Sequence, residues 1–193
     1  MRRVRFPIVA GLILLGAFAT SVGLGQFLGF PTFDWSAHTD GVGLKPSAPT
    51  RISIPALGVR ADVVQVGKAD DGSIATPVED PVGTAGWYGL GPSPGEDGTA
   101  VIVGHVDTAS RPAVFAKLGE LKVGKLIEVN RKDRRVATFT VESVERFPKT
   151  SFPADRVFTG SGGPRLVLVT CGGQWVGGDM GYADNIIVFA VAA

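Results

Sequence analysis

The pattern of apolar and polar positions changes character after about residue 30. Residues 8–30 are almost continuously apolar, and no charged residue occurs between Phe6 and Phe33. From about residue 50 onward, the apolar positions form short runs separated by Gly, Pro, Asn and Asp. A run of about 20 apolar residues is typical of a membrane-spanning helix, whereas short runs bounded by turn residues are typical of β-strands. The pattern therefore predicts one apolar helix followed by a strand-rich domain.

The strand-rich part contains seven clear runs. The first, Arg51–Ile54, alternates and stops at Pro55, and the last two are apolar enough for buried core strands. The charged residues 130–134 between two runs predict a hairpin turn, and the only helix-like stretch is Ala113–Leu121. About eight short strands in roughly 145 residues predict an all-β domain that forms a closed or nearly closed barrel without exposed edges. The runs cover residues 51–54, 61–66, 99–106, 126–129, 135–144, 165–171 and 186–191.

The apolar segment at the N-terminus is flanked asymmetrically by positive charge. Three arginines lie within residues 1–5, and no Lys or Arg follows until Lys45. The positive-inside rule then places the N-terminus in the cytoplasm and the rest of the chain outside. We expect a membrane anchor at residues 1–30 and a linker rich in Pro, Gly, Ser and Asp at residues 31–49. A cleaved signal peptide ending near Ala17–Ala19 is the alternative, and it exports the chain as well; a buried core helix is a third.

Composition limits the chemistry that the exported part can perform. The chain has 193 residues, a net charge of +1, one cysteine and two histidines. Near-neutral charge argues against a nucleic-acid partner bound through a basic face. One cysteine excludes an intramolecular disulfide and a cysteine-cluster metal site, and two histidines leave little for a histidine zinc site. We therefore expect no metal and no cofactor.

The candidate catalytic residues are Cys171 and His105. Each ends an apolar run, and Gly172-Gly173 follow the cysteine at once. A thiolate needs a nearby base or cation to form near neutral pH, and histidine provides this and can also protonate a leaving amine. Two strands that end in these residues can bring them to one rim of a barrel. The pair predicts acyl transfer through a thioester; the alternative is a buried cysteine that packs as a small apolar side chain.

Four segments of the chain resemble the sortases, and most closely the class F sortases of actinobacteria. The resemblance covers about residues 50–193 and implies an eight-stranded sortase-type β-barrel and a cysteine transpeptidase of the cell surface. It implies that Cys171 is the nucleophile and His105 the general acid/base. It also implies that an LPXTG-like sorting signal is cleaved between Thr and Gly and passed to an amine of the cell wall or a pilin. The segments are Ile52–Val59, Ala85–Tyr88, Gly104–Thr108 and Leu168–Gly173.

One departure from the family pattern bears directly on activity. Sortases carry an arginine on the last strand that holds the substrate carbonyl, and class F relatives have Tyr-Arg-Asp-Asn there. This chain has Tyr182-Ala183-Asp184-Asn185. Arg165 lies six residues before Cys171, roughly 20 Å along an extended strand, which is too far to replace that arginine. A sortase-like peptide-binding domain with little turnover therefore remains the alternative function. Other candidate donors are Arg111, Arg146, Arg156, Asn185 and the backbone amides near Gly172.

Three further residues have both a functional and an ordinary interpretation. Asp107 is two positions after His105, so on a regular strand it points to the same face and can orient the imidazole. A solvated or turn aspartate is the simpler interpretation. Trp87 and Trp175 are candidates for the border of a peptide groove, with core or rim packing as the alternative.

Overall fold

The structure is a computed structural model that describes residues 43–159, 162–178 and 181–193. The predicted anchor at residues 1–30, the candidate cleavage site and most of the predicted linker lie outside these described residues. Within the described ranges, no helix is both long enough and apolar enough to cross a membrane. The described residues form one compact unit.

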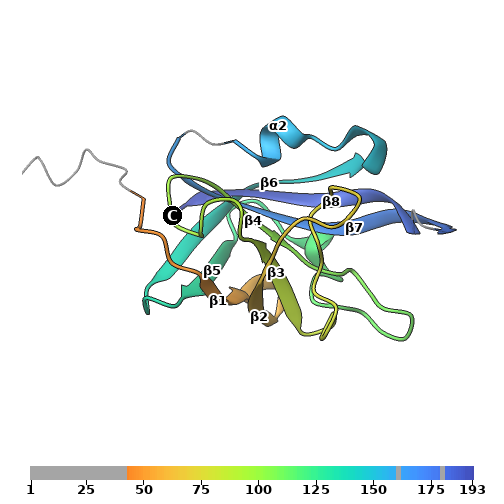
Figure 1. Ribbon diagram of the computed structural model, residues 1–193, viewed down its shortest axis with the longest axis horizontal. Coiled ribbons are helices and arrows are strands. Elements are labelled where there is room, and N and C mark those ends of the chain that lie inside the picture. Colours follow the sequence, from red (N-terminus) through yellow and green to blue (C-terminus); the bar gives the residue numbers. More distant parts are fainter. Residues whose placement is uncertain (1–42, 160–161, 179–180) are drawn as a thin grey trace, which may run out of the picture. The chain divides into compact units, whose positions relative to one another are not determined.

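The described residues form a closed barrel of eight strands (Figure 1). The order around the barrel is β1-β2-β3-β4-β7-β8-β6-β5, which confirms the predicted all-β closed barrel. Most neighbours are antiparallel, but β2 pairs with β3 and β4 pairs with β7 in parallel. The strands are β1 (Pro49–Ile54), β2 (Val59–Val66), β3 (Thr84–Tyr88), β4 (Gly98–Val103), β5 (Leu126–Arg131), β6 (Val136–Pro148), β7 (Pro164–Gly177) and β8 (Gly181–Ala192).

The structure both confirms and corrects the elements expected from the sequence. The hairpin around residues 130–134 is present as the antiparallel pair β5–β6. The helix-like stretch Ala113–Leu121 is wrong as a helix, because only the 3-10 turn η3 (Leu118–Glu120) forms there. Phe115, Leu118 and Leu121 are buried in the barrel core, so this segment folds as successive turns that each deliver one apolar side chain.

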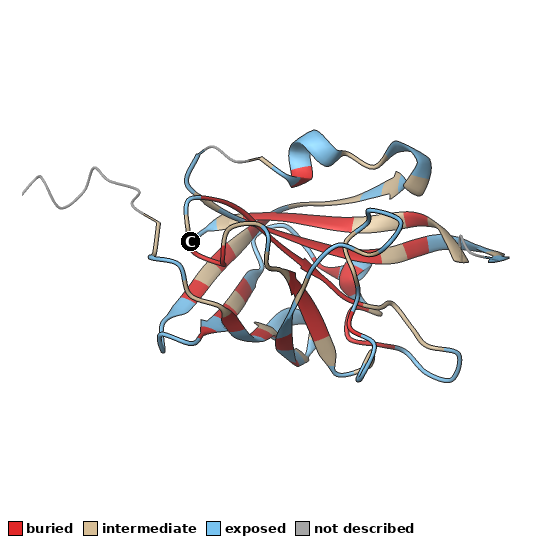
Figure 2. Ribbon diagram, in the orientation of Figure 1, coloured by how far each residue is buried: buried red, intermediate tan, exposed pale blue. Residues whose placement is uncertain are grey.

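Alternate residues of the central strands enter two separate apolar clusters. On β7, Leu166 and Leu168 point into the barrel core, whereas Val167 and Val169 belong to a second cluster on the outer face. Strand β4 is buried along its whole length because both of its faces are covered (Figure 2). The outer cluster is the feature that positions the site, because it lies on the same face of β7 as residue 171.

A short irregular segment after β6 packs over the outer cluster. It contains the 3-10 turn η4 (Lys149–Ser151) and the one-turn helix α2 (Ala154–Val157), which is drawn above β6 and β8 in Figure 1. Arg156 fastens this segment to the barrel. Its guanidinium donates to both carboxylate oxygens of Glu145 at 2.8 and 2.7 Å and lies 4.3 Å from the centre of the Phe189 ring.

The hairpin of β7 and β8 is longer than the sequence pattern indicates. Strand β7 continues past Cys171 to Gly177, and β8 begins at Gly181, five residues before the predicted start. The pairing shifts between Gly172 and Trp175, and Gly173 has φ +82°, a left-handed conformation that glycine adopts readily. The two strands extend beyond the rest of the barrel at one end (Figure 1).

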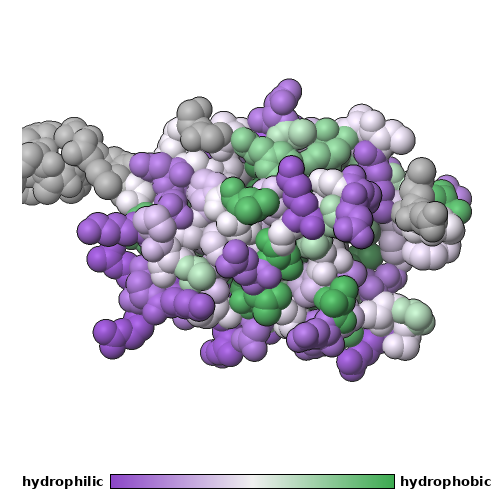
Figure 3. Space-filling model, in the orientation of Figure 1, coloured by the Kyte–Doolittle hydropathy of each residue, from purple (hydrophilic) through white to green (hydrophobic). Residues whose placement is uncertain are grey.

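The first described residues lie against the barrel. The Leu44 amide donates to the Gly95 carbonyl at 2.5 Å, and the fully buried Arg131 guanidinium donates to the carbonyls of Lys45 and Pro94. Arg131 therefore closes the barrel end at which the chain enters. On the face shown in Figure 3, apolar side chains form separate patches between charged ones, so this face presents no single continuous apolar surface.

Candidate active site

Cys171 lies on the outer face of β7, where the strand passes the end of the outer apolar cluster. It continues the alternation of Val167 and Val169, and it is a partly buried free thiol. Across the hairpin it pairs with Asn185 of β8. Opposite residues of an antiparallel pair share a face, so Asn185 is its direct neighbour on that face.

His105 reaches the same edge of the sheet from β4. The parallel pairing of β4 with β7 sets Val103 opposite Val169, and the Gly104 amide donates to the Val169 carbonyl at 3.1 Å. Each of the two predicted catalytic residues therefore lies two positions beyond one of these paired valines, Cys171 still on β7 and His105 just after the end of β4. The structure brings the predicted pair to one rim.

The imidazole of His105 is held by a backbone carbonyl. Its Nε2 lies 3.0 Å from the Pro77 oxygen, and because a carbonyl can only accept, Nε2 carries the hydrogen. In the neutral ring Nδ1 then has a free lone pair that can accept a proton. Among the described residues, no hydrogen bond joins the imidazole to the Cys171 thiol, so a proton could pass between them only after the two side chains approach each other.

Asp107 has a different partner from the one that the sequence suggests. Its carboxylate accepts a hydrogen bond from the Tyr182 hydroxyl rather than from the imidazole of His105. The pKa of Tyr182 is raised, first by this hydrogen bond, then by burial and by the negative charges of Asp107 and Cys171. Asp107 therefore ties the start of β8 to the loop that follows His105.

Neither tryptophan lines the cavity at Cys171. Trp87 is buried in the barrel core, where its indole donates to the Pro92 carbonyl at 3.0 Å. Trp175 is 63% exposed on β7 beyond the bulge and packs edge-on against Tyr182, with ring centres 5.1 Å apart. For Trp87 core packing is therefore confirmed, and Trp175 packs at the rim of the barrel against the tyrosine whose hydroxyl donates to Asp107.

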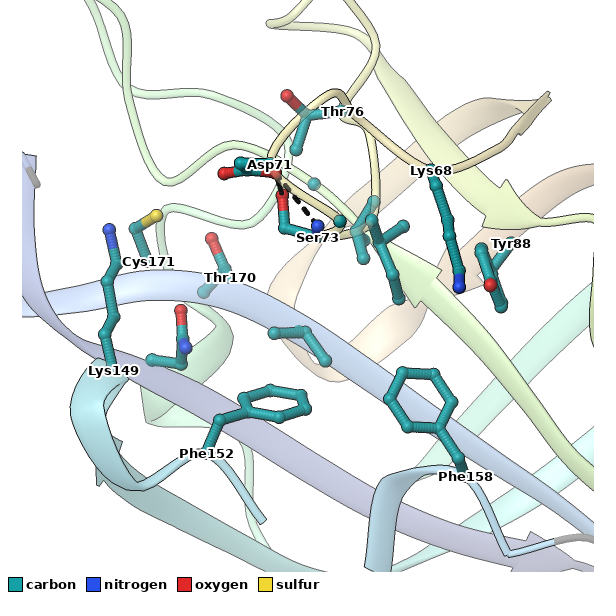
Figure 4. A pocket seen from close by; sticks show the side chains of 16 residues that line it. Lys68, Asp71, Ser73, Thr76, Tyr88, Lys149, Phe152, Phe158, Thr170 and Cys171 are labelled. Carbon is teal, nitrogen blue, oxygen red and sulfur yellow. Dashed lines mark hydrogen bonds between the residues drawn. The ribbon is translucent and has the colours of Figure 1, made fainter. Parts of the chain in front are cut away.

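A cavity of about 830 Å³ opens on the outer face of β4 and β7 and includes Cys171 (Figure 4). Val103 and Val169 form its floor, and Phe152 and Phe158 from the segment after β6 form one wall. The opposite wall is the connection between β2 and β3, where Asp71 accepts hydrogen bonds from the amide and hydroxyl of Ser73 at 2.9 and 2.6 Å. An apolar floor and an aromatic wall combined with a few polar side chains are typical of a ligand-binding pocket.

Most of this lining was missed by reasoning from the sequence. The two phenylalanines and the lysines Lys68 and Lys149 lie on connections without any periodicity, so no strand or helix pattern marks them. The only available signal was the spacing of aromatic residues, since Phe147, Phe152 and Phe158 interrupt an otherwise polar segment.

Comparison with known proteins identifies the family. The model of the sortase domain matches residues 52–193. The chain belongs to the sortase family. Sortases are cysteine transpeptidases that act on sorting signals and amine acceptors, and a partly buried free cysteine that lines a cavity fits the family's chemistry.

Solved sortases share the fold of this chain. Sortase C-1 from Actinomyces oris is 17% identical over 74% of this chain and 72% of that chain, with a TM-score of 0.59. The lid mutant of sortase A from Corynebacterium diphtheriae is 16% identical over 78% of this chain and 72% of that chain, with a TM-score of 0.60. Sortase C from Clostridium perfringens SM101 is 14% identical over 75% of this chain and 69% of that chain, with a TM-score of 0.57. These identities support the sortase-type barrel and nothing finer. No curated protein matches the chain.

The sequence resemblance assigns the last-strand arginine of sortases to the position of Ala183, which lies on β8. Asp184 pairs with Gly172 and Asn185 with Cys171, so Ala183 is on the same face of β8 as Asn185. An alanine side chain cannot donate a hydrogen bond to a substrate carbonyl. Asn185 lines the cavity beside Cys171 and keeps its place among the candidate donors.

Three of the four arginines weighed as replacements pair with carboxylates, and Arg146 does so close to Gly173. Arg146 donates to Asp184, and Arg156 is held by Glu145 and two aromatic rings. Arg165, six residues before Cys171 on β7, forms an ion pair of 3.6 Å with Glu142. The backbone carbonyl of Arg111 accepts a hydrogen bond from the Thr108 amide and closes a turn. In the described part of the chain, none of these four lines the cavity that holds Cys171.

Proposed function

We propose that the chain is a membrane-anchored sortase that cleaves an LPXTG-like sorting signal through a thioester on Cys171 and transfers the acyl group to a cell-surface amine. One observation carries the proposal. Cys171 on β7 lines one end of the groove, and His105 lies two residues beyond the last residue of β4, the strand that pairs with β7 beside the groove. A peptide lying in this groove presents a backbone carbonyl to the thiol.

The first half of the reaction forms the thioester. The Cys171 proton moves to Nδ1 of His105, and the thiolate attacks the carbonyl carbon of the threonine in the signal. The carbonyl electron pair moves onto oxygen and then returns, breaking the bond to the glycine nitrogen. The imidazolium of His105 gives its proton to that nitrogen, so that a neutral amine leaves.

The second half transfers the acyl group. An amine of the cell wall or of a pilin enters, loses a proton to His105 and attacks the thioester carbonyl. Collapse of the tetrahedral intermediate forms the new amide bond and releases the sulfur, which takes back the proton. The Pro77 carbonyl holds the ring through Nε2 during both steps, so Nδ1 is the nitrogen that exchanges protons.

The finer assignments rest on the sequence. The segments that resemble sortases favour class F, and the apolar floor and aromatic wall of the groove suit the Leu-Pro part of the signal. The asymmetric charge around residues 8–30 supports an anchor with the catalytic domain outside the cell. External protease should then digest the domain in intact protoplasts, and protection of the domain would contradict this topology.

Ala183 favours a second candidate function. A sortase fold without a donor at the attacked carbonyl can hold a sorting signal in its groove and turn it over very slowly. Losing one such donor typically costs about 10²–10³ in rate. The same groove then serves as a peptide-binding domain, and the measurement of turnover separates the two functions.

The test uses an LPXTG-type fluorescent peptide and a thiol-reactive vinyl sulfone. The parent protein should be labelled on Cys171, cleave the peptide and form a new amide when an oligoglycine amine is added. Cys171→Ala and His105→Ala should each abolish cleavage. The effects of the two substitutions on the rate should not add in the double variant, because the two residues act as a unit. Labelling without cleavage would favour the binding domain, and wild-type turnover by Cys171→Ala would refute the thioester.

A further inference from the structure

The chemistry proposed at Cys171 needs a positively charged group. Position 183, where the resemblance expects an arginine, does not supply one. When a thiolate attacks a carbonyl, negative charge develops on the carbonyl oxygen, and a donor about 2.7–3.1 Å away stabilises it. The side chain of Ala183 has no polar atom, and the four arginines considered above lie outside the lining of the cavity. Two lysines line the cavity, so the question is which of them lies at the cysteine end.

Lys149 is placed at that end by the strand pairing. Pro148, the last residue of β6, pairs with Asp184 of β8, and Asp184 pairs with Gly172 of β7, next to the nucleophile. Lys149 follows Pro148 and leads into η4, so it leaves β6 at the level of Cys171. It is partly buried and lines the cavity together with Cys171 and Asn185.

Figure 4 shows the side chain of Lys149 extended, with its amine at the end of the cavity where Cys171 lies. The other lysine, Lys68, is drawn beside Tyr88, away from the cysteine. An ammonium group offers three donors on a flexible stem, so it can follow a carbonyl oxygen without the fixed geometry of a guanidinium. Lys149 therefore has the position, the charge and the reach that position 183 lacks.

We propose that the Lys149 ammonium donates to the carbonyl oxygen under attack at Cys171 and so replaces the last-strand arginine of other sortases. This inference rests on the proposed thioester mechanism. The proposal has a second consequence: removing a cation that lies near a thiol should disfavour the thiolate even without substrate. The effect on the thiol gives a measurement that needs no peptide turnover.

The experiment compares Lys149→Met, Lys149→Arg and the control Lys132→Met, which removes an exposed lysine in the β5–β6 turn outside the cavity. Lys149→Met should lower kcat/KM for the fluorescent peptide by about 10²–10³, mainly through kcat, whereas Lys132→Met should leave it unchanged. Lys149→Arg should retain much of the rate. Adding Ala183→Arg to Lys149→Met should restore activity, because the donor then returns to the family position.

The second measurement is the rate of alkylation of Cys171 as a function of pH. Lys149→Met should move the midpoint of this profile to higher pH, and Lys68→Met should not, since Lys68 lies at the other end of the cavity. Tyr182, which interacts electrostatically with Cys171, the cavity-lining Asp71 and the nearby His105 are the same in every variant, so the difference reports on the Lys149 charge alone. Lys149→Gln provides the same test if the Met variant does not fold.

The outcomes for the two proposals are distinguishable. A parent protein that alkylates but never cleaves the peptide contradicts the proposed transpeptidase, and the alkylation profile still tests the charge of Lys149. An active parent in which Lys149→Met changes neither kcat/KM nor the alkylation profile overturns the role of Lys149. Loss of activity with an unchanged profile, and without restoration by Ala183→Arg, would also overturn it, because that combination indicates a purely structural lysine.

Discussion

Gly173 lies two residues after Cys171, in the bulge of β7. Any other residue type there would be destabilised both by the left-handed backbone and by a steric clash of its Cβ. Its φ of +82° is left-handed, and an added Cβ would lie 2.2 Å from Oδ2 of Asp184 and 2.9 Å from the Arg146 guanidinium. Asp184 is only 9% exposed and is paired with Arg146, so it has little room to move away. Gly173→Ala should therefore strain the backbone and displace this ion pair beside the nucleophile.

The magnitude follows from a matched glycine in the same strand. Gly177 has φ +76°, but its nearest neighbour to an added Cβ is the Trp175 ring nitrogen at 4.0 Å. Gly177→Ala should cost only the left-handed conformation, about 1–2 kcal/mol of unfolding free energy. Gly173→Ala should cost the same plus a charged hydrogen bond, worth about 1.5–3 kcal/mol. A gap of about 2 kcal/mol corresponds to about 4–8 °C in Tm.

Urea unfolding of the parent and both variants measures this gap. The structure predicts that Gly173→Ala is clearly the less stable of the two. In an Asp184→Ala background its cost should fall toward that of Gly177→Ala, because neighbouring substitutions that share a clash do not add. Equal destabilisation by the two alanines, or full additivity with Asp184→Ala, would refute the argument that close packing in the bulge requires Gly173.

Two further predictions concern the contacts around the groove. Tyr182→Phe keeps the ring against Trp175 but removes the donor to Asp107; kcat should fall a few-fold with little change in KM, and steady-state kinetics with the fluorescent peptide checks this. Hydrogen bonds from Arg156, then from Ser143, lower the pKa of Glu145 to about 2 from its usual 4.5. This exposed pair should contribute less than about 1 kcal/mol at pH 7, and its contribution should disappear as the pH falls from 4.5 toward 2.

Each of these predictions has a direct control. If Tyr182→Phe lowers stability and activity in parallel, the hydroxyl only supports the fold. For the ion pair, the parent should be more stable than Glu145→Gln at neutral pH, and the gap should close in acid, since a depressed carboxyl pKa stabilises only the ionised form. A gap that stays constant from pH 7 to pH 3 would mean that the Glu145 charge contributes nothing.

The barrel could be predicted from the sequence because most strands alternate between its two faces or are buried on both. Strand β3 was not predicted, because Thr84 and Gly86 interrupt its apolar residues and leave no clear apolar run. The glycine is required by distant residues, since an added Cβ would lie 2.9 Å from a methyl group of Val66 and 3.1 Å from the Pro77 ring. A residue chosen for close packing with another segment leaves no local pattern, so only the folded chain reveals why it is there.

The position of the catalytic pair could be anticipated only in part. Two apolar runs ending in His105 and Cys171 are visible in the sequence, but their meeting depends on the parallel register of β4 with β7, which no local pattern encodes. A shift of that register by one residue would turn the two side chains to opposite faces. The groove was harder still to predict from the sequence. Its aromatic wall lies on a connection whose path depends on the contacts of Arg156 and Val157 with the barrel.

The contrast between Ala183 and Lys149 shows what a position-by-position comparison of sequences can and cannot find. Such a comparison detects that the arginine is missing, because it asks what occupies one place in the chain. Stabilising an oxyanion requires a positive charge at one place in space, and any segment that reaches that place can provide it. Lys149 reaches the end of the groove because β6 pairs with β8 and β8 with β7, so its nearness to Cys171 depends on two strand registers. An absent catalytic residue in an alignment is therefore weak evidence against activity until the cations lining the folded cavity have been examined.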